Sequence, residues 1–140
     1  MAPRWKPYLR RRMSDAIKHE CGLAFIRLRK PLSHFHAKYG TPLYGLNKLY
    51  LLMEKQHNRG QDGAGVGTIK LDPVPGLNYI DRERSTDKQA IQKIFAKINK
   101  GYEEAVKAEP GAATDVELLK ARMPFLGEVL LGHLRYATFG

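Results

Sequence analysis

The chain has 140 residues, of which 43% are hydrophobic and 27% are charged, and this length and composition fit one globular domain. Its single cysteine, Cys21, excludes an intrachain disulfide and a cysteine-rich metal site, and it suits a reducing, cytoplasmic environment. No apolar run approaches the roughly 18 residues of a membrane span, and no apolar segment follows the basic N-terminus as it would in a secretory signal.

The first twenty residues are predicted to be a leader, because they are polar and charged and show no apolar period. Residues 1–12 hold five of the 24 basic residues and none of the 14 acidic ones, so half of the net charge of +10 lies there. Met13 offers a second translation start, which would place residues 1–12 upstream of the protein.

The remaining positive charges neither gather on one predicted face nor alternate with aromatic residues. We therefore expect no nucleic-acid partner and no membrane partner. A basic nucleic-acid-binding module is the alternative from another functional class, and its affinity would fall steeply with salt.

The first predicted element is a buried strand at 21–28, a short apolar run with Phe and Ile. Residues 29–42 are predicted to form a loop, because they contain two prolines and a glycine. His34 and His36 could bind a metal, but no carboxylate or thiol lies close by in the sequence, so a solvated loop is the expectation. Residues 43–58 predict a helix with an apolar face made of Leu43, Leu46, Leu49, Tyr50 and Met53.

Glycine occupies four of the nine positions from 59 to 67. This density indicates a tight backbone or close approach by another group. The segment lacks the lysine and the hydroxyl residue of a nucleotide-binding P-loop. A hairpin is predicted to follow, with strands at 64–71 and 77–84 and a turn at 72–76.

A long helix is predicted at 87–107, with Ser85, Thr86 or Asp87 as its cap. Its apolar face contains Ile91, Ile94, Phe95, Ile98, Tyr102 and Val106.

The last third of the chain predicts a loop at 109–113 and a short helix that starts with a capping-box pattern at 114–117 and ends before Pro124. Residues 129–131 predict a buried strand that runs directly into a polar cluster, where the sequence stops. The elements indicate an α+β fold. Because no further element closes it, we expect a fragment of a longer protein.

Three stretches carry a resemblance to a known family: 21–24 (CGLA), 59–65 (RGQDGAG) and 132–138 (GHLRYAT). In this order and spacing they resemble the N-terminal glutaminase domain of class II glutamine amidotransferases. Gln61 and Tyr136 favour the amidophosphoribosyltransferase branch, which begins purine nucleotide synthesis. Another class II amidotransferase, such as a glucosamine 6-phosphate synthase, is the alternative.

The resemblance implies the four-layered αββα sandwich of N-terminal-nucleophile hydrolases, with antiparallel sheets, and 21–140 would be its N-terminal part. It implies L-glutamine as substrate and a homo-oligomeric full-length enzyme. A phosphoribosyltransferase domain with its Mg²⁺ would follow, whereas no metal is expected in this segment. The oxyanion-hole Asn-Gly pair and the amine-binding aspartate are expected beyond Gly140, so the fragment itself would be inactive.

A lone cysteine in an apolar run is commonly a small core residue. The resemblance instead implies that Cys21 is the nucleophile and the first residue of the mature chain. Free thiols have a pKa of about 8.5 and α-amino groups one of about 7.7–8.0, so the amino group can accept the thiol proton. Residues 1–20 must then be removed by a cut between Glu20 and Cys21.

The other roles follow motif by motif from the same resemblance. Arg135 would hold the α-carboxylate of glutamine, a task that suits a bidentate guanidinium, and a buried ion pair is the alternative for it. Thr138 would place a hydroxyl near that carboxylate, Tyr136 would line the pocket, and Arg59 would lie near the nucleophile. The expected supporting residues are a buried structural histidine, His133, and the glycines that allow close packing beside the cysteine: Gly60, Gly63 and Gly65.

Overall fold

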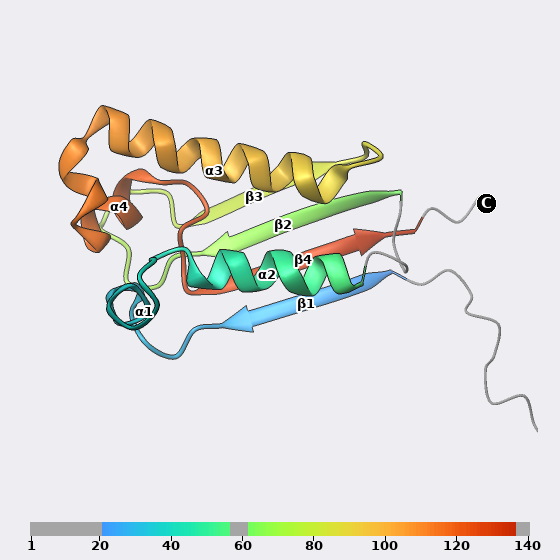
Figure 1. Cartoon of the computed structure of the whole chain (residues 1–140), viewed down its shortest axis with the longest axis horizontal. Coiled ribbons are helices and arrows are strands. Elements are labelled where there is room, and N and C mark those ends of the chain that lie inside the picture. The colour runs from blue at the N-terminus through green and yellow to red at the C-terminus, as the bar shows by residue number, and fades with distance from the viewer. Residues whose placement is uncertain (1–20, 57–61, 137–140) are drawn as a thin grey trace, which may run out of the picture.

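The computed structural model describes residues 21–56 and 62–136, which form one antiparallel sheet with helices along it (Figure 1). The strand order is β1-β4-β2-β3, and every neighbouring pair is antiparallel. The α+β class expected from the sequence is confirmed for this part of the chain. The elements are, in order, β1 (Gly22–Arg27), α1 (Leu32–Tyr39), α2 (Tyr44–Lys55), β2 (Gly63–Ile69), β3 (Ile80–Ser85), α3 (Ala90–Ala108), the 3₁₀ turn η1 (Pro110–Ala113), α4 (Val116–Arg122) and β4 (Val129–Arg135).

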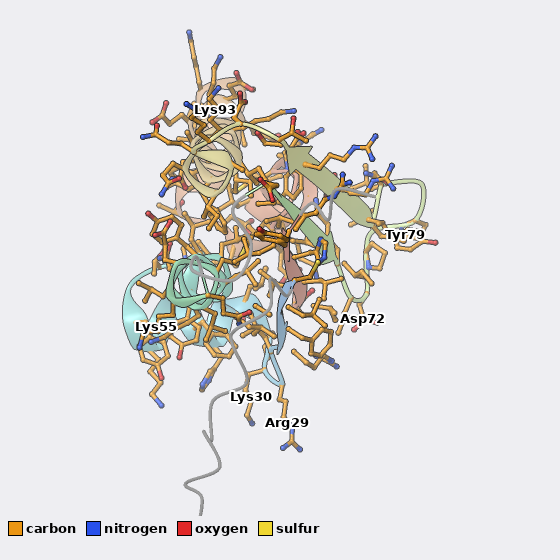
Figure 2. The ribbon with its side chains drawn as sticks, turned by 90° about the vertical axis from the view of Figure 1, so that its right-hand side faces the viewer. Arg29, Lys30, Lys55, Asp72, Tyr79 and Lys93 are labelled. Carbon is orange, nitrogen blue, oxygen red and sulfur yellow. The ribbon has the colours of Figure 1, made fainter. Side chains whose placement is uncertain are left out.

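Alternation along the strands gives the sheet one buried face. In β4, Leu130, Gly132 and Leu134 lie on the buried face, whereas Leu131, His133 and Arg135 point to the other face. Helices α2 and α3 cover the buried face with their predicted apolar stripes, including Leu49, Met53 and Ile94. Figure 2 shows this arrangement from the side, with Lys55 and Lys93 marking the helical layer and Tyr79 marking the other side of the sheet.

The distance between α2 and the sheet depends on a glycine in β4. A Cβ added at Gly132 would lie 2.5 Å from the sulfur of Met53 and 3.2 Å from Leu49 Cδ1. The helix therefore lies directly on the strand backbone at this point, and any side chain at position 132 would push it away.

The opposite face of the sheet, which we call the bare face, is not covered by any described residue. Its large apolar side chains are exposed: Leu23 is 63% and Phe25 is 62% exposed, and Leu131, Ile69 and Ile80 lie on the same face. An exposed apolar sheet face of this kind is unusual and is typical of a surface that packs against another protein layer.

The predicted loop at 29–42 is wrong, because α1 occupies most of it. Pro31 stands at the N-terminal boundary of this helix, and Gly40 ends it in a left-handed conformation with φ of 76°. Leu32 is buried, and Phe35 stacks on Tyr44 with ring centroids 5.0 Å apart. The proline and the glycine therefore bound a short helix instead of breaking the chain into a loop.

The predicted cap of the long helix is also wrong. Helix α3 begins at Ala90, and Gln89 precedes it without a side-chain capping bond. Ser85 and Asp87 bond to each other instead, and Asp87 forms an ion pair with Lys93 (2.8 Å). The short helix α4 is capped as its sequence suggests, although the cap is Asp115, which accepts a bond from the N–H of Leu118 (3.0 Å).

Candidate functional site

The three motifs named above meet at one end of the sheet. Strands β1 and β2 begin where β4 ends, on the right of Figure 1. Gly22 is paired with Leu134, so one further step of the same register places Cys21 beside Arg135. On the other side of β4, Arg135 is paired with Gly63. The sheet therefore sets Cys21, Arg135 and Gly63 in one row across three strands.

This row lies on the bare face, and its two side chains, those of Cys21 and Arg135, are open to solvent. A backbone hydrogen bond of 3.0 Å from Asp62 to the carbonyl of Arg135 fixes the end of β4. His133 is exposed on the same face, so the prediction that it is buried is wrong. The reason is that no described element covers this side of the sheet.

Charge on the bare face has one sign. The strand residues whose side chains point to it include four arginines and no carboxylate: Arg27, Arg82, Arg84 and Arg135. An anionic group that approaches this face would meet favourable electrostatic potential, strongest where the cations are least hydrated.

The predicted glycines have different surroundings. A Cβ added at Gly63 would lie 3.0 Å from the carbonyl oxygen of Ser85, so Gly63 allows close approach of the β3 backbone. Gly65 has more space, with 3.6 Å to the carbonyl oxygen of Glu83. Both lie in β2, and their lack of side chains leaves the middle of the bare face flat.

Other predicted site residues lie outside the described residues: Arg59, Gly60 and Thr138. The chain leaves the described part at Gln56 and re-enters it at Asp62, and both of these residues lie at the Cys21 end of the sheet. Tyr136 directly follows β4 and is half-buried.

The hollows of the described part do not coincide with this row. A groove of about 490 Å³ runs between α2 and α3 on the helical side, lined by apolar and amide side chains such as Tyr50, Phe95 and Asn99. The row instead lies on an open sheet face, which needs a covering layer to become a pocket.

The two histidines of the 29–42 segment lie on α1. His34 is exposed and His36 is half-buried. Within residues 21–56 and 62–136, no group of three or more His, Cys, Asp or Glu side chains is placed to hold a metal ion. The helices of this described part are also too short or too polar to cross a membrane.

A second polar cluster, missed by the sequence analysis, lies at the opposite end of the sheet. Lys120 forms an ion pair with Glu128 (2.6 Å), and both side chains are about nine-tenths buried. Lys70 donates to the carbonyl oxygens of Lys120 (2.7 Å) and Met123 (2.9 Å), and Glu128 also accepts from the N–H of Leu71 (2.8 Å).

Burial lowers the pKa of Lys70, and the neighbouring carboxylates of Asp81 and Glu128 partly offset this effect. Each charged group of the cluster has partners, and together they tie α4 to the connections that flank β2 and β4. We interpret this cluster as structural, because buried and fully bonded charges fix a fold. Its sequence signal was weak, since Lys70 and Glu128 are ordinary charged residues beside strands.

Comparison with known proteins adds no further information, because no protein-family model, curated protein or solved structure matches the chain.

Proposed function

We propose that residues 21–140 form the N-terminal part of a glutamine-hydrolysing domain of the class II amidotransferase type, in the amidophosphoribosyltransferase branch. The row of Cys21, Arg135 and Gly63 carries the proposal. These residues belong to three motifs that are far apart in the sequence, and the sheet register brings them side by side. A nucleophile next to a guanidinium suits a substrate that carries both an amide and a carboxylate.

In the proposed reaction the thiolate of Cys21 attacks the side-chain amide carbon of glutamine. The carbon–nitrogen bond breaks, ammonia leaves with the thiol proton, and a thioester forms. Water then hydrolyses the thioester to glutamate and restores the thiol. Arg135 holds the α-carboxylate through paired hydrogen bonds, and the positive bare face favours the approach of this group. Neighbouring strands lie about 4.8 Å apart, so one glutamine can reach both residues.

The proton acceptor in this proposal is the α-amino group of Cys21 itself. An amino group within a peptide bond cannot act as a base, so activity requires a cut between Glu20 and Cys21. The exposure of Cys21 at the very start of β1 supports this step, because a protease can reach the chain there.

The bare face also supports the proposal of a four-layered αββα sandwich. In an αββα sandwich, the face opposite the helices packs against a second sheet, and exposed side chains such as Leu23, Phe25 and Leu131 would form that contact. The layer would also convert the open row at Cys21 into a pocket. A phosphoribosyltransferase domain, which would use the ammonia and bring Mg²⁺, is proposed to follow in the same polypeptide.

The proposal predicts that N-terminal sequencing of active protein, expressed from the complete reading frame, begins at Cys21. In that protein Cys21→Ser should lower glutamine hydrolysis by at least about 10³-fold, because an alcohol is a much weaker nucleophile than a thiolate. Since Cys21 is exposed, the urea midpoint of the variant should stay close to that of the parent.

A Cys21→Ser variant that keeps most of the glutaminase activity would contradict the proposal. So would fully active protein whose first residue lies upstream of Cys21. The acceptor is tested separately by measuring whether the released ammonia is incorporated with phosphoribosyl diphosphate as co-substrate.

A further inference from the structure

Among the strands of the described residues, β1, which begins one residue after Cys21, is an edge strand that pairs with β4 alone. An edge strand has backbone groups that no neighbouring strand can satisfy, and its ends fray most easily. A nucleophile immediately before the first residue of such a strand needs a group that holds the strand backbone in place.

Gln56, at the C-terminal end of α2, makes this contact. Its Nε2 donates to the carbonyl oxygen of Leu23 (3.1 Å), two residues after the nucleophile. Its own N–H bonds to the carbonyl of Met53 (3.0 Å), so the side chain extends from the last turn of a helix whose buried face is packed on the sheet. The bond therefore links a fixed helix end to the free edge of β1.

Gly22 leaves the space that the side-chain amide of Gln56 occupies. A Cβ added at Gly22 would lie 2.7 Å from Oε1 of Gln56 and 3.4 Å from Cβ of Leu134. The amide of Gln56 thus lies directly over the residue that follows Cys21, and a side chain at position 22 would push it away. One residue supplies the hydrogen bond and the other leaves the space for it.

We propose that Gln56 is a positioning residue for the nucleophile: through Leu23 and Gly22 it holds the first residues of β1 at a fixed distance from Arg135. This inference rests on the proposed function. It adds the C-cap residue of α2 to the site, and it assigns the glycine after the cysteine a role in packing against that residue. Small displacements of a reacting group cost much in rate, so the contact matters more for chemistry than for stability.

The test uses the mature protein from the complete reading frame and a chloromethyl ketone analogue of glutamine. The thiolate of Cys21 displaces chloride from this probe, a sulfur–carbon bond forms, and the thiol proton passes to the buffer. Gln56→Met keeps the length of the side chain and removes the donor. We expect the maximal inactivation rate to fall about tenfold or more, with little change in the half-saturating probe concentration.

Gln92→Met is the matched control. Gln92 is also an exposed amide that donates to a group on α2, the carboxylate of Glu54 (2.8 Å), but it does not contact β1. Its inactivation rate should equal that of the parent. Gly22→Ala should reproduce the defect of Gln56→Met, and the two changes combined should cost little more than either alone, because both remove the same contact.

Unchanged inactivation of Gln56→Met, with a parent that still reacts saturably, would overturn the positioning role and leave the proposed function standing. A parent that reacts with the glutamine analogue no faster than with iodoacetamide would overturn both. Amide exchange at Leu23 and Ala24 then shows independently whether Gln56 holds the strand.

Discussion

The two faces of the sheet are built from the same strands but have opposite properties. The helical face buries Leu130 and Leu134 of β4 under α2, with glycine where the helix comes closest. The bare face exposes apolar side chains, arginines and the row that contains Cys21. Side chains alternate between the two faces along a strand. Adjacent residues of β4 therefore allow a covered face to be compared with an uncovered one.

This difference separates stability from function in the molecule. The helical face and the Lys120–Glu128 cluster hold the fold, and the charged groups of the cluster are already paired within the described residues. The bare face contributes little to stability in this form, yet it carries the residues suited to a ligand. The proposed second layer would increase the contribution of the bare face to stability. Substitutions on the two faces can detect this increase.

The largest expected effect comes from Leu130→Ala compared with Leu131→Ala. Leu130 is fully buried under the helices, so its truncation should lower the free energy of unfolding by about 3 kcal/mol. Leu131 is 41% exposed on the bare face, and its truncation should cost below about 0.5 kcal/mol in the 140-residue chain. Urea denaturation of the two variants measures the difference.

The same two variants, Leu130→Ala and Leu131→Ala, can also be compared in the protein expressed from the complete reading frame. If a second sheet packs on the bare face, Leu131→Ala should become destabilising there, by an amount that approaches the cost at Leu130. Equal and small effects of Leu131→Ala in both contexts would contradict a covering layer. A large effect already in the 140-residue chain would show that this face is buried by another means, such as self-association.

An intermediate effect is expected from alanine at two glycines of the sheet. At Gly132 the added Cβ would lie 2.5 Å from Met53, and the resulting overpacking should cost about 1–3 kcal/mol, less if Met53 changes rotamer. At Gly67 the nearest atom would lie 3.9 Å away, so alanine there should be neutral or stabilise by about 0.5 kcal/mol through the lower entropy of the unfolded chain. Thermal unfolding midpoints that move in the same direction for both would contradict the packing described for α2.

The sequence predicted the elements of this fold where the apolar period was long. The apolar stripe of α3 came directly from residue spacing, and the hairpin of β2 and β3 came from the turn cluster at 72–76. The structure confirms both. The helix α1 was missed, because Pro31 and Gly40 act as its boundaries, and eight residues between two breakers give too short a pattern to distinguish helix from loop.

The site was predictable only in part, and for a physical reason. The motifs of Cys21 and Arg135 could be identified by their residues, but their adjacency depends on the register between β1 and β4, which local sequence does not determine. Gln56 could not be found at all, since one glutamine at a helix end carries no signal until its contact with Leu23 is known. Exposure of His133 likewise depends on what covers the sheet, which is a property of the whole fold.

The smallest expected effect lies at the rim of the helical face, where Lys97 of α3 forms an ion pair with Glu83 of β3. The hydrogen bond from Lys97, assisted by the N–H of Arg84, holds the pKa of Glu83 below its ordinary value. A lowered carboxyl pKa stabilises the fold above the unfolded pKa, and this contribution is lost as the pH falls through the folded pKa. Lys97→Met should therefore cost about 0.5 kcal/mol at neutral pH, and the difference from the parent should vanish in acid once Glu83 is protonated in both states.

Lys100→Met on the same helix is the control. Its pair with Glu104 is longer (3.7 Å) and both side chains are exposed, so this variant should change the urea midpoint little at any pH. A cost of Lys97→Met that persists unchanged in acid would contradict the assignment of this stability to the Lys97–Glu83 pair, because methionine keeps an unbranched apolar side chain of similar length and removes only the charged group.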